Sequence, residues 1–101
     1  MIVTREQDGE TASLRRGEEV LLSLPENPTT GYRWAFVTEG LDLAEDSYLG
    51  QAESAAGAGG TRRVRLVANR PGAASLSATL QRSWEGPSRA VDHCDFHFNV
   101  S

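Results

Sequence analysis

The sequence predicts an all-β protein, built as a sandwich or a barrel of short strands. Apolar residues alternate with their neighbours at a period of two along several segments, and no stretch carries a helical stripe of useful length. Turn signals containing Gly or Pro separate these segments at short spacing. Many short strands divided by such turns are typical of two packed sheets or of a closed barrel.

The alternation also predicts which residues face the core, because successive side chains of a strand point to opposite faces. The expected inward sets are, in chain order, Val20, Leu22 and Leu24; Tyr32, Trp34 and Phe36; Val64, Leu66 and Ala68; Ala74, Leu76, Ala78 and Leu80; and Cys94, Phe96, Phe98 and Val100. Leu41 to Leu49 has no clear period and is expected to form short strands or a turn. Gly50 to Gly60 is a low-complexity stretch rich in Ala and Gly, which is typical of a loop tip.

Length and composition restrict the classes of function. A chain of 101 residues predicts one domain, residues 1–101, large enough to bury a core without metal or disulfide. The formal net charge of -4 opposes binding to nucleic acid, and no segment is apolar enough to predict a membrane span. The single cysteine, Cys94, excludes a disulfide within the chain. The opening "MIVTREQDGET" lacks the apolar region of a secretory signal, so the expectation is a cytoplasmic protein or the mature form of an exported one.

The block "DHCDFH", Asp92 to His97, contains the residue types of a metal site or of a Cys-His nucleophile. On a strand, however, His93 and His97 lie four residues apart, roughly 13 Å at about 3.3 Å per residue, which is too far to share one ion. Cys94 falls on the apolar face, opposite both histidines. The expectation is therefore a buried thiol between two surface histidines, with no metal and no cofactor.

Other chemistry-bearing residues do not form a recognisable catalytic set. The carboxylates stand at turns without an evident acid-base pair, and the glycines of "GAGG" neither precede a helix nor carry the Lys-Ser/Thr of a phosphate loop. An enzyme is the weakest of the functional hypotheses.

Three loops remain as candidate binding elements. In "NPTTG", Asn27 to Gly31, Pro28 restricts one φ angle, the Asn27 side chain can bond to the backbone nearby, and Gly31 allows a positive φ, so the loop should be narrow and stiff. In "GAGG", Gly57 to Gly60, absent side chains allow another backbone to approach closely. In "RSWEG", Arg82 to Gly86, a tryptophan stands at a loop tip. Each loop alone can also be read as a simple connection; their conjunction and order carry the functional hypothesis.

In this order, "NPTTGYRW", "GAGGT" and "RSWEG" resemble the chagasin family, protein inhibitors of papain-like cysteine peptidases. That family carries NPTTG followed by an aromatic residue, then GxGG, then Arg-Pro-Trp. The likeness runs from about Gly17 to the carboxy terminus and includes the "RPG" turn at Arg70 to Gly72. It departs from the family pattern at Ser83, where the family has proline.

The resemblance implies an immunoglobulin-like β-sandwich with three binding loops at one end, acting as a reversible, tight-binding inhibitor and as a monomer. It places Trp34 in the core and leaves Arg82 either to pair with an acidic group of the peptidase or to brace its own loop. The implied peptidase-binding residues are Asn27, Pro28, Thr29, Thr30, Gly31 and Tyr32; Gly57, Ala58, Gly59 and Gly60; and Arg82, Ser83 and Trp84. The alternative is a non-inhibitory module of the same architecture, such as an adhesion or carbohydrate-recognition domain, because fold alone does not specify function.

Overall fold

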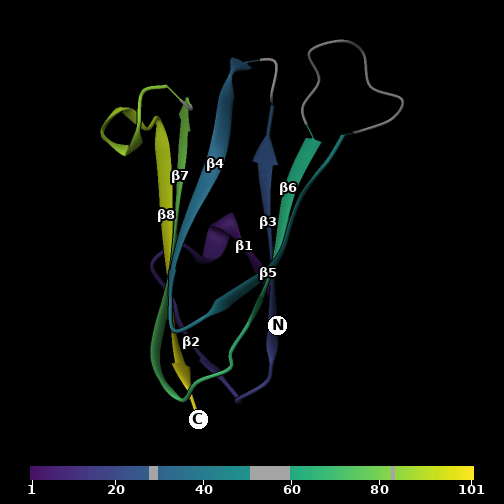
Figure 1. The fold of residues 1–101 in the computed structure, drawn as a ribbon, viewed down its shortest axis with the longest axis vertical. Coiled ribbons are helices and arrows are strands. Elements are labelled where there is room, and N and C mark those ends of the chain that lie inside the picture. Colours follow the sequence, from purple (N-terminus) through teal and green to yellow (C-terminus); the bar gives the residue numbers. More distant parts are fainter. Residues whose placement is uncertain (28–29, 51–59, 83) are drawn as a thin grey trace.

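Two four-stranded sheets face each other in the computed structural model, which describes residues 1–27, 30–50, 60–82 and 84–101 (Figure 1). The first sheet has the order β1-β3-β6-β5 and the second the order β2-β8-β7-β4. The strands are β1 (Ile2–Thr4), β2 (Thr11–Leu14), β3 (Glu19–Glu26), β4 (Tyr32–Glu39), β5 (Asp42–Leu49), β6 (Gly60–Val67), β7 (Gly72–Arg82) and β8 (Asp92–Val100). The chain also has 3₁₀ helices at η1 (Arg5–Gln7) and η3 (Pro87–Arg89), and no helix of the described residues is long and apolar enough to cross a membrane. The architecture is an immunoglobulin-like β-sandwich, as the resemblance implied.

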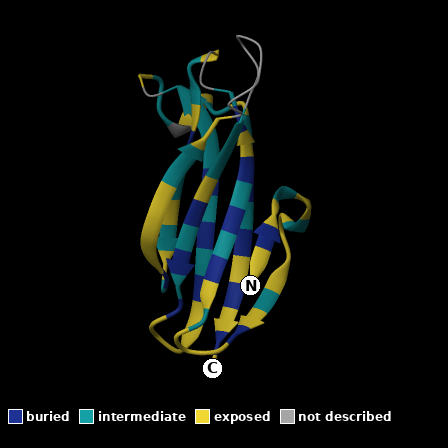
Figure 2. Ribbon diagram, turned by 90° about the vertical axis from the view of Figure 1, so that its right-hand side faces the viewer, coloured by how far each residue is buried: buried dark blue, intermediate teal, exposed yellow. Residues whose placement is uncertain are grey.

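The core lies between the sheets and contains the inward residues expected from the period of two, except Tyr32, which is half-buried at the start of β4 and lies outside the core cluster. Buried and less buried residues alternate along β3, β6, β7 and β8 (Figure 2). Trp34 is 5% exposed and belongs to the core cluster, while Phe36 and Leu80 pack against it partly buried. The pleat alone therefore predicted most of the buried surface, because it sends every second side chain to the same face.

The placement of the "DHCDFH" block is also as expected. Cys94 is fully buried on β8, and that burial raises the pKa of its thiol to about 11. His93 and His97 are exposed on the opposite face of the same strand. Among the residues that the structure describes, no three His, Cys, Asp or Glu side chains are grouped so that they could hold a metal ion.

The segment Leu41–Leu49 differs from its expectation of short strands or a turn. Its residues Asp42 to Leu49 form one strand, β5, which pairs antiparallel with β6 along its length. The register shifts between Leu43 and Glu45, so a bulge interrupts the alternation that would have revealed the strand in the sequence. β5 is also an edge strand with mostly exposed residues, and this weakens the apolar signal further.

Two short strands near the amino terminus were not predicted. β1 pairs in parallel with β3, and β2 pairs in parallel with β8. They bury Val3 and Leu14, each 2% exposed. Strands of three and four residues are too short to display a period, and their parallel partners lie far away in the sequence.

Candidate functional site

The strand ends that carry the three candidate loops lie together at one end of the sandwich (Figure 1). The end of β3 pairs with the start of β6, Glu26 opposite Gly60, and the end of β5 lies on the other side of β6. In the second sheet, Tyr32 at the start of β4 is opposite Arg82 at the end of β7. Of the proposed binding residues, Asn27, Thr30, Gly31, Tyr32, Gly60, Arg82 and Trp84 are described; Pro28, Thr29, Gly57, Ala58, Gly59 and Ser83 lie outside the described residues.

The first loop is closed by the Thr30 hydroxyl and by a left-handed glycine. Oγ1 of Thr30 donates to the Asn27 carbonyl at 2.7 Å and accepts the Tyr32 amide at 3.3 Å, while the Thr30 amide donates to the same carbonyl at 3.2 Å. Gly31 has φ 83°, which confirms the positive φ expected there. Three local hydrogen bonds and a backbone conformation that side chains disfavour thus fix the two described ends of the loop, Asn27 and Thr30 to Tyr32.

The third loop rests against the first. Trp84 is 72% exposed, as expected for a tryptophan at a loop tip. A methyl group on Gly31 would lie 3.3 Å from Cη2 of Trp84, so the glycine backbone is directly beside the indole ring. The two loops therefore form one continuous surface, although they are separated by more than fifty residues in the chain.

Arg82 contacts both aromatic residues of this surface. Its guanidinium carbon lies 4.6 Å from the ring centroid of Tyr32 and 5.8 Å from that of Trp84. Its Nη1 is 3.5 Å from Oε1 of Glu85, and the Glu85 amide donates to the Arg82 carbonyl at 3.1 Å. Of the two roles left open for Arg82, bracing is the one for which the isolated chain supplies contacts, because cation-π and ionic contacts both tie it to its own loops.

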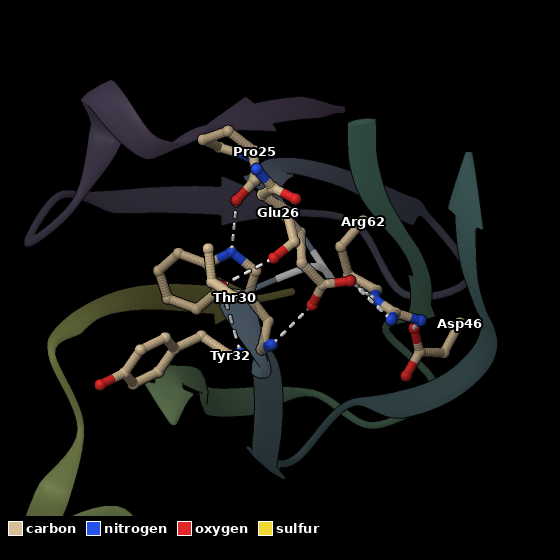
Figure 3. Close-up of polar contacts among 8 residues, drawn as sticks. Pro25, Glu26, Thr30, Tyr32, Asp46 and Arg62 are labelled. Atoms are coloured by element: carbon tan, nitrogen blue, oxygen red, sulfur yellow. Dashed lines mark hydrogen bonds and ion pairs between the residues drawn. The ribbon is translucent and has the colours of Figure 1, made fainter. Parts of the chain in front are cut away.

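The bases of the first and second loops meet at a buried ion pair that sequence reasoning missed (Figure 3). The carboxylate of Glu26 accepts two hydrogen bonds from Arg62, at 3.1 Å from Nε and 2.7 Å from Nη2. Burial lowers the pKa of the Arg62 guanidinium, but the hydrogen bonds and charge of Glu26 outweigh it and raise that pKa, so the arginine stays charged. The period-two alternation of the strands could have revealed this pair. Glu26 continues the inward-facing positions of β3, and Arg62 comes one inward-facing position before those of β6. Two opposite charges on diagonal inward positions of paired strands indicate an internal pair.

Gly60 is a proposed contact residue, and the packing of β5 against β6 also requires a glycine at this position. A Cβ at this position would clash with the backbone oxygen of Leu49 and would lie 2.6 Å from Oη of Tyr48. The sequence predicted that another backbone could approach the glycines of this loop closely. At Gly60 the backbone that does so is that of the neighbouring strand β5.

We therefore expect Gly60→Ala to lower the melting temperature clearly, because backbone atoms of β5 and β6 would have to separate. Gly50→Ala is the matched control, since a Cβ there meets only Cε2 of Tyr48 at an ordinary 3.5 Å. Thermal unfolding of both variants checks this. Equal melting temperatures for the two variants would contradict the packing described for Gly60.

Between the first loop and Gly60 the surface is hollowed, with a volume of about 510 Å³. Glu26, Thr30, Tyr32 and Gly60 are among the residues that line it. The described part of the site thus consists of the hydrogen-bonded ends of the first loop, an exposed tryptophan and a hollow.

Comparison with known proteins gives the family. Residues 13–100 match the sequence profile of the chagasin family of peptidase inhibitors, I42. Chagasin of Trypanosoma cruzi is 33% identical over 93 residues, covering 85% of this chain and 84% of chagasin. The chain therefore belongs to the chagasin family, whose members are protease inhibitors and not enzymes.

Solved structures agree in fold. The cysteine protease inhibitor EhICP2 of Entamoeba histolytica superposes with a TM-score of 0.86 at 19% identity, covering 99% of this chain and 93% of that protein. The solution structure of amebosin superposes with a TM-score of 0.83 at 25% identity, covering 100% of this chain and 97% of amebosin.

Proposed function

We propose that this protein inhibits papain-like cysteine peptidases reversibly, with residues 1–101 acting as one inhibitor domain whose three loops occlude the active-site cleft. Family membership supports the class of target. The observation that carries the loop assignment is the contact between Gly31 and Trp84, which joins two of the family's loop motifs into one surface. A non-inhibitory adhesion or carbohydrate-binding module has no evident need for the "NPTTG" turn.

The geometry of the first loop suggests why the inhibitor is not cleaved. A papain-like cleft takes an extended chain and attacks a carbonyl that is held in line with the catalytic thiol. The Thr30 hydroxyl and amide both bond to the Asn27 carbonyl, three residues back, and Gly31 has a positive φ, so the described ends of the loop do not continue as an extended chain. In this proposal Thr29, Thr30 and Gly31 lie nearest the catalytic Cys-His pair and present no carbonyl in line for attack.

The other two loops extend the contact on either side. Gly57 to Gly60 are proposed to run along the substrate groove through backbone contacts, and Trp84 to pack on an aromatic surface of the primed side. Because Arg82 already fixes Trp84 and Tyr32 in the free protein, little conformational entropy is lost on binding, which favours tight affinity.

Titration of papain with the purified protein tests the proposal. Activity is expected to fall to zero at one inhibitor per active peptidase, to return on dilution or competition, and to leave the inhibitor chain intact by mass spectrometry. Trypsin, a serine peptidase with a different cleft, serves as the unaffected control. Absence of inhibition, or stoichiometric cleavage between Asn27 and Tyr32, would refute the mechanism.

A further inference from the structure

A charged pair is buried at the inner face of the sandwich, directly below the loops. Glu26 is 3% exposed and is the buried charged residue among those that the structure describes; the side chain of Arg62 is 13% exposed. A buried ion pair is costly to desolvate and is often no more stabilising than apolar side chains of similar size. Its presence among the leucines and valines of β3 and β6 therefore calls for a reason other than stability.

The bonds of this pair reach four strands from both sheets (Figure 3). Oε1 of Glu26 on β3 accepts the backbone N–H of Trp34 on β4 at 2.7 Å. β4 is an edge strand whose sheet partner is β7, so this amide is satisfied by the opposite sheet rather than by a strand ladder. On the other side, Nη1 of Arg62 on β6 donates to Asp46 on β5 at 3.2 Å.

These contacts close the bases of two loops at once. Glu26 and Trp34 flank the first loop, and the indole Nε1 of Trp34 adds a second tie at 2.8 Å to the Pro25 carbonyl. Asp46 and Arg62 flank the second loop, and the guanidinium of Arg62 also lies 5.7 Å from the ring centroid of Tyr48 on β5. One guanidinium and one carboxylate thus connect all four strands that lead into these loops.

We propose that the Glu26–Arg62 pair is a positioning device that sets the first and second loops at the separation the peptidase cleft requires. The proposal rests on the inhibitory function proposed above. A binding constellation must be held to within about 0.5 Å by supporting groups, and a planar guanidinium with several hydrogen bonds fixes geometry better than an apolar contact or a lysine does. Glu26 and Arg62 act through the loops and do not themselves need to touch the peptidase.

The first experiment compares Arg62→Met with Arg65→Met. Arg65 is a matched control because it stands on the same strand and also pairs with carboxylates of β3 and β5, Glu19 at 2.9 Å and Glu45 at 3.6 Å, but its side chain is 36% exposed. We expect Arg62→Met to weaken papain inhibition about tenfold or more, in part through a slower association rate, because fewer molecules hold both loops in the binding-competent arrangement. Arg65→Met should change the inhibition constant less than twofold.

The double variant Glu26→Gln/Arg62→Met separates positioning from folding. It leaves no uncompensated buried charge, and the amide oxygen of glutamine can still accept the Trp34 N–H, so the variant remains folded even where Arg62→Met alone does not. Because the glutamine NH2 has no partner once Arg62 is gone, we expect a lower melting temperature than that of the wild type, a chain still folded at the assay temperature, and inhibition about tenfold weaker. Arg62→Lys keeps the positive charge but lacks the planar set of donors of the guanidinium, so it should inhibit more strongly than Arg62→Met and more weakly than the wild type. A folded double variant that inhibits as well as the wild type would overturn the positioning role.

A second readout is independent of any peptidase. Amide hydrogen exchange at Thr30, Gly31 and Thr61 is expected to be faster in the double variant than in Arg65→Met, because the loop bases are no longer tied together. Unchanged exchange at these amides would refute the positioning role even if the wild type inhibits papain. A wild type that does not inhibit papain, combined with faster exchange in the double variant, would refute the proposed function and leave the positioning of the loops standing.

Discussion

Replacing Trp84 with alanine is expected to weaken inhibition of papain about thirtyfold. Tryptophans that become desolvated at an interface commonly cost about 2 kcal/mol or more when truncated, and that free energy corresponds to this factor in the inhibition constant. In the free protein, the side chain is 72% exposed and contacts its surroundings mainly through Gly31 and Arg82. The melting temperature should therefore barely move.

The contrasting control is Trp34→Phe. Trp34 is 5% exposed, and its indole Nε1 donates to the Pro25 carbonyl at 2.8 Å, so the substitution removes this hydrogen bond and leaves the buried ring smaller, and it should lower the melting temperature. Inhibition constants and melting temperatures of both variants test whether Trp84 acts by contacting the peptidase and Trp34 by stabilising the core. A large loss of stability with unchanged inhibition in Trp84→Ala would show that Trp84 has a structural role only.

Replacing Gly31 with alanine is expected to reduce both stability and inhibition. The φ of 83° costs an L-residue about 1 to 2 kcal/mol. In addition, the new methyl group would lie 3.3 Å from Cη2 of Trp84, so the indole must shift on the surface that is proposed to bind the peptidase. We expect a loss of about tenfold in the inhibition constant, corresponding to about 1.4 kcal/mol of binding free energy.

Gly17→Ala is the matched control for the backbone effect. Gly17 has φ 90°, nothing lies within 4 Å of an added Cβ, and its amide bonds to Ala68 beyond the far end of β6, away from the loops. Denaturant unfolding should show a similar loss of stability in both variants, whereas only Gly31→Ala should weaken inhibition. A tenfold loss of inhibition in Gly17→Ala would mean that general destabilisation, and not the loop surface, controls binding.

Some of the candidate site could be predicted from the residues alone. The positive φ of Gly31, the exposure of Trp84 and the burial of Trp34 follow from local chemistry: a turn that needs glycine, an aromatic residue outside the strand pattern, and one within it. The role of Thr30 in closing the first loop was not predicted, since the Asn27 side chain and Gly31 appeared sufficient for the turn.

The sequence by itself determined the all-β class, most of the inward-facing residues and the three loop motifs, because strand alternation and turn chemistry depend on neighbours in the chain. Tertiary structure alone decided which distant segments become neighbours: the parallel pairing of β1 with β3 and of β2 with β8, the contact of Gly31 with Trp84, and the meeting of Glu26 with Arg62. These contacts join residues that are distant in sequence, so no local period encodes them. They arise when strands that are distant in the chain pair side by side within a sheet, and at the loop end of β3 and β6 the inward positions are filled by charges rather than by leucine or valine.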